Sequence, residues 1–159
     1  MKIDRIEKSL NNCESLPSEV GLEIQNLLIK AILIYISVQF SQKVKLLIKN
    51  KLLTIRNQPI RNFTSSCVDS QFSKLNPKYK DIKSLINRFR DPYKRKFDEE
   101  IDIINQNDCA TNAYDSLINN RNNAAHSQDI NLTLREVRQF YEQAHLILDC
   151  LQKALEIRE

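Results

Sequence analysis

The sequence has very little glycine and no tryptophan: its 159 residues include one glycine, Gly21, and four prolines. Tight β-hairpin turns are built from Asn-Gly, Asp-Gly or Gly-Gly pairs, so an antiparallel β fold is nearly excluded. A dinucleotide-binding fingerprint and a phosphate-binding P-loop each need several glycines at fixed spacing, and a single glycine excludes both.

The four cysteines form no recognisable motif. Cys13, Cys67, Cys109 and Cys150 lie far apart, with no CxxC pair and no histidine at metal-ligand spacing. This spacing gives no sign of a zinc site or a thioredoxin-like site. We therefore expect buried thiols in a reducing compartment, and neither a metal nor a cofactor.

No segment of the sequence is typical of a leader or a membrane anchor. Residues 1–10 are charged and lack the continuous apolar stretch of a secretory leader. The longest apolar run, 27–40, is interrupted by Lys30 and is shorter than the ~20 residues that span a bilayer. We therefore expect a cytoplasmic protein that makes no contact with a membrane.

The positive charge is concentrated in residues 74–96, here called the basic stripe. Nine Lys or Arg residues stand there against two Asp, although the net charge of the whole chain is only +4. Such a stripe suits contact with phosphate groups, and a solvated helix face has the same composition. The residues of the stripe that we single out for phosphate contact are Lys83, Arg88, Arg90, Lys94 and Arg95.

Apolar residues recur at helical spacing through most of the sequence. Residues 20–53 are predicted to form a long helix whose middle is apolar all round, which suits a helix covered by other helices or by a second copy of the chain. Residues 1–17 are predicted as an N-terminal extension or short helix. Residues 54–78, which include Pro59 and Pro77, are predicted as an irregular connection with only short helical pieces.

The remaining sequence also predicts helices. They are expected over 79–90, from 92 to about 107, from about 108 to 119, and over about 134–157. A capping box formed by Thr133 and Glu136 opens the last of them. Residues 1–159 are thus predicted to be a single all-α domain, a helical bundle without internal repeats.

Acid–base chemistry near neutral pH points to one of two histidines, whose unperturbed pKa is about 6.5. His126 follows a run of asparagines that disfavours a continued helix, and it lies close in sequence to Arg121. On an unbroken helix these two side chains would be ~140° apart, so they could face one ligand only through an irregular turn or from two subunits. His145 lies inside the last predicted helix, where we expect a structural role.

The residues Arg121, Asn122 and His126 match a motif of arginine, a polar residue, and a histidine after four to six intervening residues. The chain resembles the HEPN domains that carry this motif, and is closest to the RiboL-PSP-HEPN-like group, over about residues 22–155. Further residues share the likeness: Asn76, Pro77, Ile82, Leu85, Phe89, Ala125 and Thr133. A second match, Arg138 and Gln139 with His145, falls in mid-helix and is set aside as a decoy.

The resemblance implies an all-α HEPN-like bundle that acts as a homodimer and cleaves RNA without a metal or cofactor. His126 would be the general base or acid, Arg121 would bind the phosphate oxygens, and Asn122 would orient the phosphate or the histidine. The basic stripe would then contact the RNA backbone. Such nucleases are toxins or antiviral effectors and are usually restrained by an antitoxin or a partner protein.

Two other functions fit the same sequence. One is a non-catalytic HEPN-like module that dimerises or binds a partner, with Arg121 pairing a carboxylate such as Asp115 or Asp129. The other is a nucleotide-binding accessory subunit of a neighbouring enzyme.

Overall fold

The residues that the computed structural model describes form helices joined by short turns. These residues are 22–72, 77–89, 91–105, 109–126 and 130–156, with Lys8, Asn11, Asn12, Ser15 and Gln128. The helices within them are α2 (Leu22–Leu52), α3 (Gln58–Phe72), α4 (Tyr79–Ile86), α5 (Asp91–Ile104), α6 (Cys109–Ala125) and α7 (Leu134–Leu155). The predicted all-α fold, with its long N-terminal helix and capped C-terminal helix, is confirmed. The predicted N-terminal extension, 1–17, lies mostly outside the described residues.

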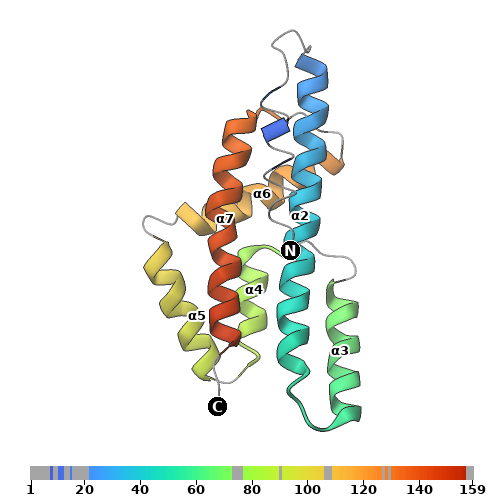
Figure 1. Ribbon diagram of the computed structural model, residues 1–159, viewed down its shortest axis with the longest axis vertical. Helices are drawn as coiled ribbons and strands as arrows, with labels where there is room; N and C mark the ends of the chain where they lie inside the picture. Colours follow the sequence, from blue (N-terminus) through green and yellow to red (C-terminus); the bar gives the residue numbers. More distant parts are fainter. Residues whose placement is uncertain are drawn as a thin grey trace.

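The longest helices, α2 and α7, lie side by side and run in the same direction (Figure 1). α6 crosses both of them, α5 packs on α7, and α3 folds back along the end of α2 (Figure 1). One hydrophobic core joins side chains from α2 to α7. The core therefore fixes α6, which carries the candidate catalytic residues, against the two longest helices.

α2 is an uninterrupted helix of 31 residues, about 46 Å long at 1.5 Å per residue. Its buried residues recur at three and four, as in Leu33, Ile36, Phe40 and Val44, and these side chains are fully buried. By length and composition alone, the stretch Ile24–Leu52 could cross a membrane. Its middle is packed instead against α6 and α7, as expected of a core helix.

An aromatic cluster centred on Phe40 connects α2 to α6 and α7. The Phe40 ring stacks on Tyr114 of α6, with ring centroids 5.9 Å apart. It also contacts Tyr141 of α7 at 5.9 Å and the edge of His145 at 6.4 Å. Ring pairs at these distances add specific geometry to the apolar area that they bury.

The prediction of an irregular connection over 54–78 is wrong, because this stretch contains the 15-residue helix α3. The Asn57 side chain accepts a hydrogen bond from the Ile60 backbone N–H at 3.1 Å, so it caps the helix, and Pro59 stands in the first turn, where proline is tolerated. Asp69 then binds Lys45 of α2 at 2.6 Å and Lys49 at 2.7 Å. These contacts hold a segment of weak helical pattern against α2.

Side chains bind backbone N–H groups at the first residues of α7 and α4. Thr133 accepts a hydrogen bond from the Glu136 N–H at 3.2 Å, and the Glu136 carboxylate accepts one from the Thr133 N–H at 2.7 Å. This is the predicted capping box. Asp115 of α6 accepts a hydrogen bond from the Tyr79 N–H at 2.8 Å, at the first residue of α4. The carboxylate considered above as a partner of Arg121 thus connects α6 to the start of α4.

Candidate active site

The candidate residues lie where α6 ends. The prediction that the asparagine run ends the helix near residue 119 is wrong, because α6 continues to Ala125. Its buried residues Tyr114, Leu117, Ile118 and Ala124 pack in the core, and this packing outweighs the low helix propensity of asparagine, a fraction of a kcal/mol per residue. Arg121 and Asn122 of the motif therefore lie on a regular helix, and His126 stands directly after its last residue.

Arg121 and Asn122 are in direct contact in the last turns of α6. The Arg121 Nη1 donates a hydrogen bond to Asn122 Oδ1 at 3.1 Å. Arg121 is half-buried, since it follows Leu117 and Ile118 by four and three residues on the inner face of the helix. Asn122 thus contacts the arginine. The role that the resemblance implies for it, orienting the phosphate or the histidine, stays a prediction.

His126 lies directly after the last helical residue, and its side chain is exposed. Its backbone N–H donates to the carbonyl oxygens of Asn122 at 3.1 Å and Asn123 at 3.2 Å. The Gln128 N–H then donates to the Asn123 carbonyl at 3.0 Å, the bond that closes a Schellman-type helix end. The backbone of the histidine is thereby fixed at the C-cap, while its imidazole is open to a ligand.

The regular helix separates the directions of the two key side chains. Arg121 and His126 are five positions apart, which corresponds to ~140° around a helix axis. One side chain lies on the half-buried face and the other is exposed. A ligand that touches both groups of a single chain would have to reach around the end of α6.

His145 is held inside α7. Its Nδ1 lies 3.2 Å from Asp149 Oδ2, one turn further along the helix. Its ring contacts Tyr141 with centroids 6.0 Å apart, and the side chain is 20% exposed. The structure therefore gives this histidine packing contacts and a carboxylate partner. The i+4 position of Asp149 is a signal from which this partner could be predicted.

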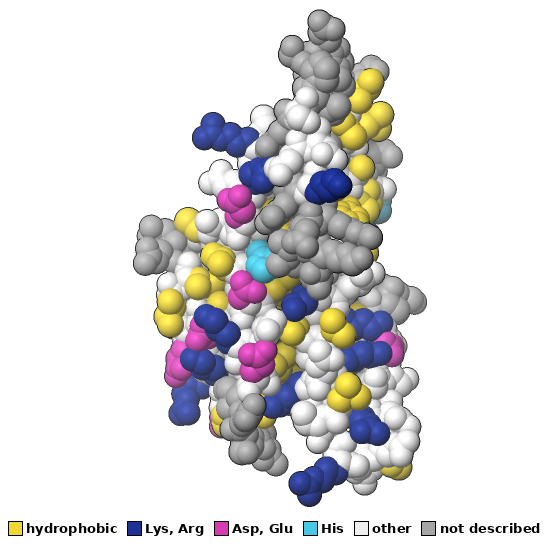
Figure 2. All heavy atoms as spheres, in the orientation of Figure 1, with side chains coloured by type: hydrophobic (Ala, Val, Ile, Leu, Met, Phe, Trp, Pro, Cys, Tyr) yellow, Lys and Arg dark blue, Asp and Glu magenta, His cyan; other side chains and the backbone are white. Residues whose placement is uncertain are grey.

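The basic stripe is interleaved with carboxylates. Lys83 binds Asp98 at 3.0 Å, and this hydrogen bond raises the pKa of Lys83. Arg95 lies 3.8 Å from Glu99 at the i+4 position. Figure 2 shows Lys and Arg side chains alternating with Asp and Glu over α5.

The other cations of the stripe do not gather beside the motif. Lys94 lines a shallow depression together with carboxylates of α5. Arg88 lines a separate pocket between α3 and α4, and Arg90 lies outside the described residues. α5 lies on one side of α7, whereas the C-terminal end of α6 emerges on the other side, beyond α2 (Figure 1).

The described residues contain no cluster of three or more His, Cys, Asp or Glu that could hold a metal ion. The expectation of buried thiols holds for Cys150, where burial raises the thiol pKa to about 11. It is wrong for Cys67 and Cys109, which are exposed on α3 and at the start of α6. Cys13 lies outside the described residues.

Comparison with known proteins agrees with the all-α fold. The family model RiboL-PSP-HEPN matches residues 2–156. The chain belongs to this HEPN family. No curated protein and no solved structure matches it.

Proposed function

We propose that this protein is a metal-independent endoribonuclease that acts as a homodimer. The observation that carries the proposal is the end of α6, where Arg121 and Asn122 are hydrogen-bonded and His126 is exposed at the C-cap. These residues form the arginine–histidine motif in a chain of the HEPN family.

The chemistry follows from the three side chains. The His126 imidazole takes the proton from a ribose 2′-OH, whose oxygen attacks the adjacent phosphorus and expels the 5′-oxygen of the next nucleotide. The 5′-oxygen takes up a proton as it leaves, and the imidazolium returns its proton to the solvent or to that oxygen. The products are a 2′,3′-cyclic phosphate and a 5′-hydroxyl. Arg121 binds the non-bridging oxygens as negative charge builds on them, and Asn122 holds the guanidinium in place through its 3.1 Å hydrogen bond.

A second subunit would allow Arg121 and His126 to face the same phosphate, although they lie on different faces of one chain. A two-fold axis near the ends of two α6 helices would bring Arg121 of one subunit toward His126 of the other, whereas the two positions of one chain are ~140° apart around an ideal helix. The regular helix through Ala125 supports this arrangement, because no irregular turn separates Arg121 from the residue before His126.

The direct test is incubation of purified protein with single-stranded RNA in the presence of a chelator. We expect cleavage that leaves 2′,3′-cyclic phosphate ends, and no cleavage when the scissile nucleotide is 2′-deoxy. His126→Ala and Arg121→Ala each lower the rate by about 10²–10⁴, whereas His145→Ala, the matched histidine control, retains cleavage. Equal activity of wild type and His126→Ala refutes the site assignment.

The biological role in this proposal is a toxin or antiviral effector that cleaves RNA in the cytoplasm and is restrained by an antitoxin or partner protein. This step rests on the family alone. The test is expression of the wild type in growing cells, alone and together with a neighbouring gene product. Growth arrest by the wild type that the second protein abolishes supports the role, and the absence of any growth arrest that depends on His126 contradicts it.

Exposed apolar side chains favour a second candidate, a non-catalytic module that binds a partner. Ile24 and Leu27, three positions apart on α2, are 53% and 65% exposed. Side chains of this kind are common on protein-binding surfaces when they gather in one patch. An intact dimer that cleaves no RNA under any condition favours this module over the nuclease.

A further inference from the structure

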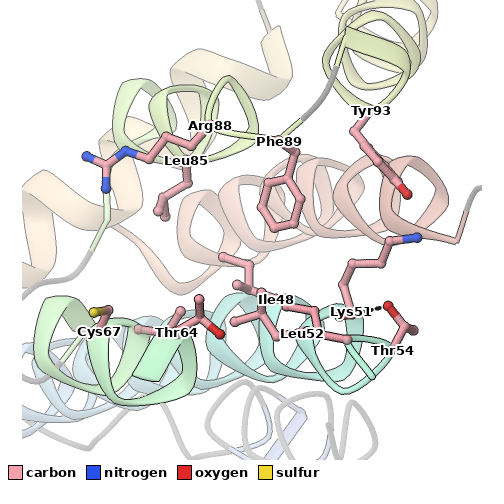
Figure 3. Close-up of a pocket in the computed structure, with 12 residues that line it drawn as sticks. Ile48, Lys51, Leu52, Thr54, Thr64, Cys67, Leu85, Arg88, Phe89 and Tyr93 are labelled. Atoms are coloured by element: carbon pink, nitrogen blue, oxygen red, sulfur yellow. Dashed lines mark hydrogen bonds between the residues drawn. The ribbon is translucent and has the colours of Figure 1, made fainter. Parts of the chain in front are cut away.

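A pocket of about 420 Å³ lies between α3 and α4, far from the motif at the end of α6. Figure 3 shows its walls: α2 and α3 form one side, and α4 with the residues that follow it forms the other. The volume falls in the range of sites for small ligands, about 300–1,000 Å³. We call it the α3–α4 pocket.

The pocket is open because α3 packs mainly on α2. Asp69 ties α3 to two lysines of α2, and Val68 is its buried core residue. On the opposite wall, the side chains of Leu85 and Phe89 point toward Ile48 of α2 across the space (Figure 3). The middle of the pocket is therefore bounded by aliphatic and aromatic carbon.

The two threonine hydroxyls in the walls already donate their protons to the backbone. Thr64 Oγ1 donates to the Ile60 carbonyl at 2.9 Å, and Thr54 Oγ1 donates to the Lys51 carbonyl at 2.7 Å. A nucleobase or a sugar needs several donors and acceptors in its site, and these walls offer few. A hydrocarbon chain needs none.

The two charged side chains that line the pocket within the described residues are both cations. Lys51 Nζ lies 4.4 Å from the centroid of the Tyr93 ring, at one end of the pocket. Arg88 and Cys67 lie at the other end, where the guanidinium points away from the apolar walls (Figure 3). A cation held over an aromatic ring at the mouth of an apolar slot is complementary to an anionic head group.

We propose that the α3–α4 pocket binds a small anionic amphiphile with a linear apolar tail, such as a medium-chain carboxylate. The tail lies between Ile48, Leu85 and Phe89, and the head group binds Lys51. This ligand site is independent of the proposed ribonuclease, so either can fail without the other.

The first experiment is calorimetric titration of the full chain with octanoate, decanoate and dodecanoate, each below its micelle-forming concentration. Burial of two more methylenes strengthens binding by about 15-fold, until the tail fills the pocket. Decanol and decyltrimethylammonium carry the same tail without the negative charge, and we expect both to bind at least tenfold more weakly than decanoate. Equal affinities for decanoate, decanol and decyltrimethylammonium overturn the proposal.

The second experiment locates the ligand with variants. Lys51→Met is expected to weaken decanoate binding by about tenfold, since a charge-assisted contact is lost. Lys80→Met, on the exposed side of α4, is the matched control and leaves binding unchanged. A larger loss of decanoate affinity in Arg88→Met than in Lys51→Met overturns the placement of the head group. The Thr64→Phe side chain fills the pocket, so unchanged decanoate binding in this variant overturns the site.

A measurement on the unaltered protein keeps the test valid if a variant fails to fold. Cys67 lines the pocket, whereas Cys109 is an equally free and exposed thiol at the start of α6. Saturating decanoate is expected to slow alkylation of Cys67 by iodoacetamide at least fivefold and to leave Cys109 unchanged, as read by peptide mass spectrometry. Equal alkylation of Cys67 with and without decanoate overturns the proposal.

Discussion

The aromatic cluster around Phe40 predicts how much stability holds α6 in place. Phe40 is fully buried and its ring contacts rings of α6 and α7 at centroid distances of 5.9 to 6.4 Å. Replacing Phe40 by alanine removes these contacts and leaves a cavity that three long helices cannot close by moving together. We therefore expect Phe40→Ala to lower the free energy of unfolding by about 3–5 kcal/mol.

Urea unfolding followed by far-ultraviolet circular dichroism measures this loss. For a chain of this size, about 3–5 kcal/mol corresponds to a fall in Tm of about 6–20 °C. The matched control is Phe63→Ala on α3, where the side chain is 71% exposed and the expected change is within about 0.5 kcal/mol. A Phe40→Ala protein that loses no more stability than Phe63→Ala would contradict the packing described for α2, α6 and α7.

Two further predictions concern polar groups in or beside the core. The Tyr114 hydroxyl is buried without a hydrogen-bond partner among the described residues, and burial raises its pKa. We therefore expect Tyr114→Phe to raise the free energy of unfolding by about 1 kcal/mol. A fall of that size would contradict this description of the hydroxyl. Lys153 and Lys96 hold the pKa of Glu100 below its usual value of 4.5, so its stabilisation is full above pH 4.5 and is lost as the pH falls toward the lowered pKa. Unfolding measured across this acid range should depend less on pH in Glu100→Gln than in the wild type, and identical slopes contradict the ion pairs.

The parts of the fold that sequence predicts well are those where local signals agree. The three-and-four spacing of apolar residues marks α2 and α7, and the Thr133–Glu136 box marks the start of α7. For these elements the pattern, the cap and the packing all favour the same structure.

The parts that sequence missed depend on contacts between distant segments. The sequence does not predict α3 because Pro59 is typical of a helix break. In the structure Asn57 caps the helix, and Asp69 pairs with lysines of α2 some 20 residues away. The end of α6 was predicted too early because asparagine propensity is weaker than core packing. The pairing of Arg95 with Glu99 was within reach, since the two residues stand at the i+4 spacing of one helix.

Part of the candidate site is likewise visible in the sequence, and part depends on the folded structure. The motif residues can be picked from the sequence, but the contact between Arg121 and Asn122 and the C-cap position of His126 depend on where the helix ends. The α3–α4 pocket has no sequence signal, because its walls come from four separate segments.

The most direct test of the proposed nuclease is a purified heterodimer of Arg121→Ala and His126→Ala subunits, each inactive as a homodimer. If each site takes its arginine from one subunit and its histidine from the other, one of the two sites is complete and about half of the wild-type cleavage returns. A heterodimer of wild type with the double variant then has no complete site and stays inactive. The reverse pattern, with the first heterodimer inactive and the second half active, would contradict a catalytic site shared between subunits.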